Sequence, residues 1–111
     1  MSSVYEFDMS PAVMEERTHD SEYPVLRYVY LPMGESDRQG IEEQYAIEEG
    51  EYNDCTQWLV LEHRDVESDT SEIQVWPLAA DYSGPYDTPI LTYDIDLWDN
   101  VIDNIKNDCL M

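Results

Sequence analysis

Two apolar runs separated by a polar interval make up the stretch around which the chain is organised, Gln57–Leu78. Its two ends, Gln57–Glu62 and Glu72–Leu78, are rich in leucine, β-branched and aromatic side chains, which pack well on a pleated surface. The interval between them, His63–Ser71, is polar and charged, so we expect an exposed connection. The pattern predicts an antiparallel hairpin, with Pro77 at a strand end because proline cannot donate to a ladder.

Shorter patterns predict the elements that cover the apolar face of this hairpin. The segment 35–50 is interpreted as a helix because Ile41 and Tyr45 lie four residues apart, although Tyr45 and Ile47 also fit a strand edge. The other expected elements are a strand at 4–9, a helix at 11–17, a strand at 23–31, a turn-rich loop at 82–89 and a short strand at 89–93.

The clearest helical pattern in the chain lies at about 95–108, where apolar residues recur at spacings of three and four. Asp94 precedes this pattern and is expected to be its N-cap. Asp96, Asp99 and Asp103 form a second stripe, roughly opposite the apolar one at about 100° per residue. The segment therefore predicts an amphipathic helix with an acidic outer face.

These elements predict a single α+β domain over residues 1–111. An antiparallel sheet, centred on the hairpin at about 57–78 with Trp58 and Trp76 as its anchors, is packed by the C-terminal helix at about 95–108. Hydrophobic residues make up 42% of the chain, which is enough to bury a core.

Charge adds the most unusual property of the sequence. The chain has 26 acidic and 5 basic residues, a formal charge of -21. Binding to DNA or to an anionic membrane requires the opposite sign, so both are excluded as direct partners. The natural complement is a strongly basic protein, such as a nuclease or another nucleic-acid-binding protein, approached by a monomer or homodimer.

Known catalytic and metal-binding patterns are missing from the sequence. His19 and His63 stand apart, and no nucleophile elbow, phosphate-binding glycine loop or paired-histidine zinc motif occurs. Asp94, Asp96 and Asp99 resemble part of a calcium loop but lack its glycine and distal glutamate. We therefore expect no enzyme activity, no metal and no cofactor.

Two cysteines, Cys55 and Cys109, are too few to indicate a disulfide framework. The first residues contain neither a basic region nor an apolar run of signal-peptide length, and no transmembrane segment is expected. This combination favours free thiols and the cytoplasm of a bacterial or archaeal host.

Carboxylates recur in every segment, and helical neighbours three or four residues apart lie about 5–6 Å from each other. A DNA strand carries one charge per about 3.4 Å, so a folded array of carboxylates offers a DNA-binding groove a comparable line of charge. The candidate partner-binding residues are Asp94, Asp96, Asp99 and Asp103 near the C-terminal helix, Glu42, Glu43, Glu48 and Glu49 in segment 35–50, and Asp65, Glu67 and Asp69 in the hairpin connection. Tyr82 and Tyr86, beside Gly84-Pro85, are candidate aromatic anchors, although packing within the turn is the commoner role.

The small size, the single lysine and the acidic, aromatic-rich composition resemble the phage-encoded DNA-mimic proteins of the anti-restriction and anti-CRISPR type. The stretch at 94–103 is similar to a helix of one anti-restriction member, which itself resembles bent B-form DNA. The resemblance covers about a tenth of the chain, and that member is largely helical. It implies a non-enzymatic inhibitor that occupies the nucleic-acid site of a restriction or CRISPR effector.

Two alternatives share the acidic composition. Adaptation to molar salt also produces acidic, lysine-poor chains, but the low alanine and glycine content, four of each, speaks against it. An immunity protein that neutralises a basic nuclease toxin would have the same electrostatics as a mimic. The sequence does not separate that alternative from the mimic.

Overall fold

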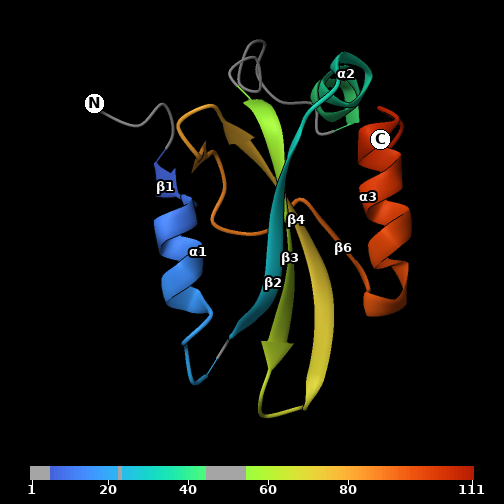
Figure 1. The fold of residues 1–111 in the computed structure, drawn as a ribbon. Helices are drawn as coiled ribbons and strands as arrows, with labels where there is room; N and C mark the ends of the chain where they lie inside the picture. The colour runs from blue at the N-terminus through green and yellow to red at the C-terminus, as the bar shows by residue number, and fades with distance from the viewer. Residues whose placement is uncertain (1–5, 23, 45–54) are drawn as a thin grey trace.

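A computed structural model of the chain describes residues 6–22, 24–44 and 55–111, with only the backbone described at Glu42 and Gln44. The described residues form two antiparallel sheets and three α-helices (Figure 1). In chain order the elements are β1 (Phe7–Asp8), α1 (Pro11–Arg17), β2 (Val25–Pro32), α2 (Glu35–Gln44), β3 (Cys55–Asp65), β4 (Thr70–Ala79), β5 (Ser83–Gly84), β6 (Leu91–Asp94), a 3₁₀ turn (Ile95–Leu97) and α3 (Trp98–Lys106).

The hairpin of β3 and β4 is the centre of the larger sheet, whose strand order is β2-β3-β4-β6. Val60 lies opposite Val75 in this hairpin, so the two β-branched side chains share one face of the sheet. The small second sheet pairs β1 with β5. The prediction of an α+β fold with an antiparallel sheet centred on this hairpin is therefore confirmed.

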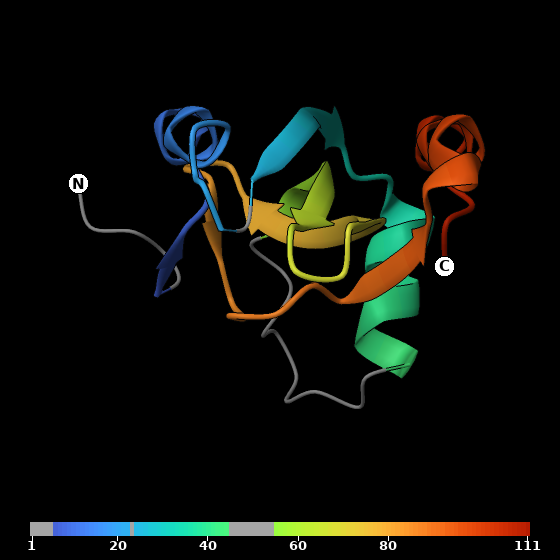
Figure 2. The same cartoon turned by 90° about the horizontal axis from the view of Figure 1, so that it is seen from below.

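The two faces of the large sheet carry separate apolar clusters, because successive side chains of a strand point in opposite directions. Trp58 and Val60 belong to the cluster that includes Val101 and Ile105 of α3. The opposite cluster, with Leu59, Leu61 and Trp76 of the hairpin, includes Met14 of α1. Figures 1 and 2 show the consequence, with α1 and α3 flanking the sheet on opposite sides. Both faces of the central strands are thus buried.

The predicted connection at 63–71 was too long. β3 continues to Asp65 and β4 begins at Thr70, so the turn itself spans only 66–69. His63 and Glu72 are direct cross-strand partners. Polar side chains are compatible with strand structure here because this end of the hairpin projects beyond the covering helices (Figure 1).

The predicted position of Pro77 was also wrong. Pro77 is buried within β4, opposite Trp58. On the other side of β4 the pairing with β6 ends at Val75. A proline is compatible with this position because no ladder to β6 continues past it.

Helix α1 has the predicted bounds, whereas β6 begins two residues later than predicted. Asp94 occupies the N-cap position of the 3₁₀ turn that leads into α3, as predicted, but its side chain makes no capping hydrogen bond, and the N-cap of α3 itself is Leu97. Helix α2 confirms the helical interpretation up to Gln44, and the remainder of the predicted segment, 45–50, lies outside the described residues.

Hydrogen bonds join α2 to the C-terminal residues 108–111. The Asp108 carboxylate accepts the backbone N–H of Ser36 at 3.0 Å and that of Asp37 at 2.9 Å. In return, Asp37 Oδ1 accepts the N–H of Met111 at 2.9 Å. A Cβ at Gly34 would lie 2.1 Å from the Asp108 carboxyl carbon, so a side chain there would collide with this cap. The helix N-terminus is thus closed by a residue about seventy positions away.

Both cysteines are free thiols, Cys55 in the core and Cys109 at the surface. Among the described helices, none is long and apolar enough to cross a bilayer.

Candidate partner-binding surface

The outer face of the 3₁₀ turn and of α3 carries the acidic stripe that the sequence predicted. Asp96, Asp99 and Asp103 are exposed, whereas Val101 and Ile105 of the same segment are buried against the sheet. Asp99 and Asp103 are one turn apart, about 6 Å along the helix axis. Neutralising these carboxylates would therefore leave the core contacts of α3 in place.

Two further carboxylates extend this stripe onto the sheet. Glu72 of β4 lies directly opposite Asp94 of β6, and both side chains are exposed. We call the five residues Glu72, Asp94, Asp96, Asp99 and Asp103 the acidic row. The sequence did not single out Glu72, because only the register of β4 and β6 brings it beside Asp94. Within the described part of the chain, no member of the acidic row forms an ion pair.

A shallow hollow of about 340 Å³ opens beside the start of the acidic row. Leu97, with 37% of its surface exposed, lines it together with Tyr93. Glu72 and Asp94 belong to the same lining, so apolar surface adjoins the first two charges of the row. Leu97 falls within the helix predicted at about 95–108, but it lies in the 3₁₀ turn and is partly uncovered.

The hairpin tip is less negative than its sequence indicated. Asp69 forms an ion pair with Arg64, which offsets one of the three predicted carboxylates. Asp65 is partly buried and accepts the N–H of Glu67 at 3.0 Å, which stabilises the turn. Only the side chain of Glu67 is exposed there without a described partner. The tip is therefore a weaker candidate than the acidic row.

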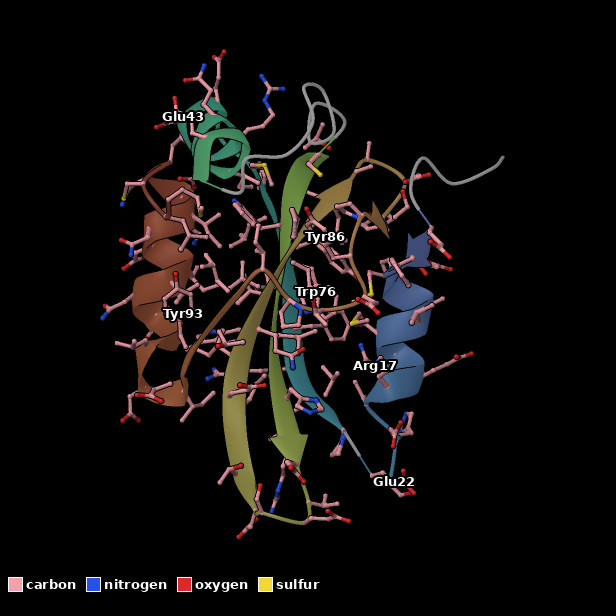
Figure 3. The ribbon with its side chains drawn as sticks, turned by 180° about the vertical axis from the view of Figure 1, so that it is seen from behind. Arg17, Glu22, Glu43, Trp76, Tyr86 and Tyr93 are labelled. Carbon is pink, nitrogen blue, oxygen red and sulfur yellow. The ribbon has the colours of Figure 1, made fainter. Side chains whose placement is uncertain are left out.

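The predicted acidic residues of segment 35–50 lie at the other end of the molecule. Glu43 is exposed on α2, at the opposite end from Glu22, as Figure 3 shows. Glu42 belongs to α2 without a described side chain, and Glu48 and Glu49 lie outside the described residues. Since α3 runs between the hairpin end and the α2 end, the acidic row follows the side of the molecule that connects them (Figure 1).

Two of the few cations form ion pairs with carboxylates outside the acidic row. Arg27 Nε lies 2.9 Å from Glu62 Oε1, and its guanidinium carbon lies 3.9 Å from the ring centre of Trp98. This side chain joins β2, β3 and α3 through an ion pair and a cation–π contact. Arg64 in turn pairs with Asp69. Neither cation forms an ion pair with a member of the acidic row.

Asp37 is the only fully buried carboxylate among the described residues. Burial raises its pKa, and the nearby charge of Asp108 raises it further, whereas the hydrogen bond from the Met111 N–H lowers it. Its neighbours are the α2 cap and the C-terminal tail, so its role is structural. Within the described ranges, no three His, Cys, Asp or Glu side chains are grouped to hold a metal ion.

Comparisons with protein-family models, with curated proteins and with solved structures find no match to this chain.

Proposed function

We propose that the chain is a non-enzymatic, DNA-mimic inhibitor that occupies the positively charged nucleic-acid site of a partner protein. The partner class is a restriction enzyme, a CRISPR effector or another basic nucleic-acid-handling protein in the cytoplasm of a prokaryotic host. The observation that carries the proposal is the acidic row, five exposed carboxylates on β4, β6, the 3₁₀ turn and α3.

Two properties of the row support this role. Like charges directly opposite on neighbouring strands destabilise a sheet, so the Glu72–Asp94 pair is a feature that stability alone would not favour. The row also lies on packed elements, which keeps its charges in place before a partner arrives. A rigid acidic surface avoids the deformation energy that real DNA requires when a protein bends it.

Competition with DNA tests the proposal directly. The immobilised chain is incubated with a prokaryotic lysate at low salt, and bound proteins are released with short duplex DNA or with the same concentration of a neutral polymer. We expect a nucleic-acid-binding protein that duplex DNA releases and the neutral polymer does not. Capture that survives excess DNA would contradict the proposal, because the partner's nucleic-acid site would then be open.

The acidic row supplies the matched variants. A chain with Asp96, Asp99 and Asp103 changed to asparagine should lose most of this capture, whereas one with Glu16, Glu22 and Glu43 changed to glutamine should keep it. Both variants lose three exposed negative charges. An equal loss of capture in the two variants would show that net charge, not the row, carries the interaction.

A further inference from the structure

A hollow of about 380 Å³ lies at the end of the sheet remote from the hairpin tip, where β2 ends and β3 begins. Its walls combine two tyrosine rings with short aliphatic and polar side chains. The lining residues are Tyr30, Leu31, Pro32, Thr56, Gln57, Ala80 and Tyr82. We call this cavity the tyrosine hollow.

The two rings are held in a fixed arrangement. Tyr30 and Tyr82 meet edge to face, with ring centres 5.0 Å apart and an interplanar angle of 74°. Tyr82 has a φ of 67°, which is uncommon for a bulky residue. Its N–H donates to the Ala79 carbonyl at 3.0 Å, and its own carbonyl accepts the N–H of Met9 at 2.9 Å. The backbone therefore holds Tyr82 in this conformation from both sides.

The polar groups of the tyrosine hollow are suited to a ligand that donates hydrogen bonds. The Tyr30 hydroxyl already donates to the Met9 carbonyl at 2.7 Å, and Gln57 Nε2 donates to the Ala79 carbonyl at 2.7 Å. Both side chains still offer oxygen lone pairs, and the Gln57 amide keeps one further N–H. None of the seven lining residues is cationic.

Negative charge is close to the same walls. Burial raises the pKa of Tyr30, and the neighbouring Tyr28, Tyr82 and Asp8 raise it further. Tyr30 thus stays a neutral phenol, and it interacts electrostatically with the Asp8 carboxylate. Aromatic faces attract cations within about 6 Å of the ring centre, and a nearby carboxylate adds to that attraction.

We propose that the tyrosine hollow binds the guanidinium group of an arginine side chain presented by the basic partner. The planar guanidinium stacks on a tyrosine ring and donates to the remaining acceptors, while its alkyl stem packs on Leu31 and Pro32. Arginine suits such a site better than lysine, whose ammonium does not stack. The inference rests on the proposed function only for the source of the arginine.

The test uses small probes, so it does not depend on knowing the partner. N-acetyl-arginine amide and its neutral isostere N-acetyl-citrulline amide are titrated into the ¹⁵N-labelled chain at low salt. We expect saturable shifts at the Gln57 and Tyr82 amides with arginine, and binding about two- to fivefold weaker with citrulline. Equal binding of the two probes, or shifts confined to the acidic row, would overturn the inference.

Two variants separate this inference from the proposed function. Tyr82→Phe should keep arginine binding, because the ring remains, and Tyr82→Leu should reduce it to the citrulline level. If Tyr82→Leu still binds arginine as well as the wild type, the hollow is not the site. If the probe binds the hollow while no partner is displaced by DNA, the guanidinium site stands and the mimic proposal fails.

Discussion

Glu72 and Asp94 lie directly opposite each other on neighbouring antiparallel strands, and both carboxylates are exposed. A side-chain hydrogen bond from Gln74 to Glu72, at 3.2 Å, orients one of them without neutralising it. Such like-charge pairs lower the stability of a sheet. The β4–β6 edge of the sheet therefore holds two neighbouring negative charges, and their repulsion lowers the free energy of unfolding.

A double-mutant cycle measures the repulsion in this pair. Glu72→Gln and Asp94→Asn should each raise the free energy of unfolding by about 0.2–1 kcal/mol, because each removes the same repulsion. The double mutant should gain little more than either single mutant. Urea unfolding gives the four values. Full additivity, as expected for the distant exposed pair Glu16 and Asp103, would mean that the opposed carboxylates do not interact.

Neutralising the α3 stripe should affect binding and not folding. The triple change of Asp96, Asp99 and Asp103 to asparagine should leave the chain as stable or slightly more stable, since fewer like charges repel. Association with the partner should slow and its salt dependence should become shallower. Stopped-flow rates are compared with those of the Glu16, Glu22 and Glu43 glutamine variant. If the comparison variant slows and the α3 variant does not, the binding face lies elsewhere.

The chain should be folded at ordinary ionic strength. Each face of the sheet has its own buried cluster, and salt at physiological strength already screens exposed charges over about 8 Å. Circular dichroism between 0.05 and about 3 M salt checks this prediction. Structure that forms only above molar salt would instead support adaptation to high salt, the alternative that shares this composition.

Asp37 should make stability depend on pH. Its pKa is raised in the folded chain, so the folded state holds this proton more tightly than the unfolded state. The associated stability is complete below the ordinary carboxyl pKa, about 4, and is lost as pH rises through the raised value. Relative to Asp37→Asn, the wild type should therefore lose unfolding free energy from about pH 4 upward. The same substitution at the exposed Asp87 controls for the loss of one charge, and parallel pH profiles for both variants would refute the assignment.

Removing the Asp108 side chain should weaken α2. Asp108→Gly deletes the carboxylate that caps Ser36 and Asp37, while glycine still accepts the φ of 55° at this position. We expect a loss of about 1–2 kcal/mol in unfolding free energy. Asp108→Asn should lose less, because its single oxygen can still accept one of the two N–H groups. Equal stability of the glycine variant and the wild type would show that the cap contributes nothing.

The strand and helix patterns predicted the fold well where one apolar stripe dominated. Trp58, Trp76 and the spacing of α3 were sufficient to place the hairpin and the helix that packs on it. The predicted strand boundaries were wrong where polar residues or a proline occur inside a strand. The polar residues His63 to Asp65 belong to the part of β3 that extends beyond the covering helices. Pro77 fits within β4 because the pairing of β4 with β6 stops at Val75.

The candidate site was predicted only in part. Exposure of Asp96, Asp99 and Asp103 follows from helical spacing alone. The partnership of Glu72 with Asp94 depends on strand register, and the loss of negative charge at Asp69 depends on where Arg64 points. Neither relation has a local signal. Tyr82 was recognised as a candidate anchor, but its partner Tyr30 lies in a distant strand, whereas Tyr86 packs against the core cluster of Trp58 and Val60.

The cap of α2 has a consequence for how the chain acquires its structure during synthesis. The β3–β4 hairpin closes through a short turn and can form early, since local contacts have a low loop-closure entropy. Helix α2 is made before that hairpin, yet two of its terminal N–H groups are satisfied only when Asp108 arrives. Until Asp108 has been made and has docked, these two N–H groups at the α2 N-terminus lack this partner. Docking of residues 108–111 is expected to be a late folding step, visible as a phase that Asp108→Gly removes.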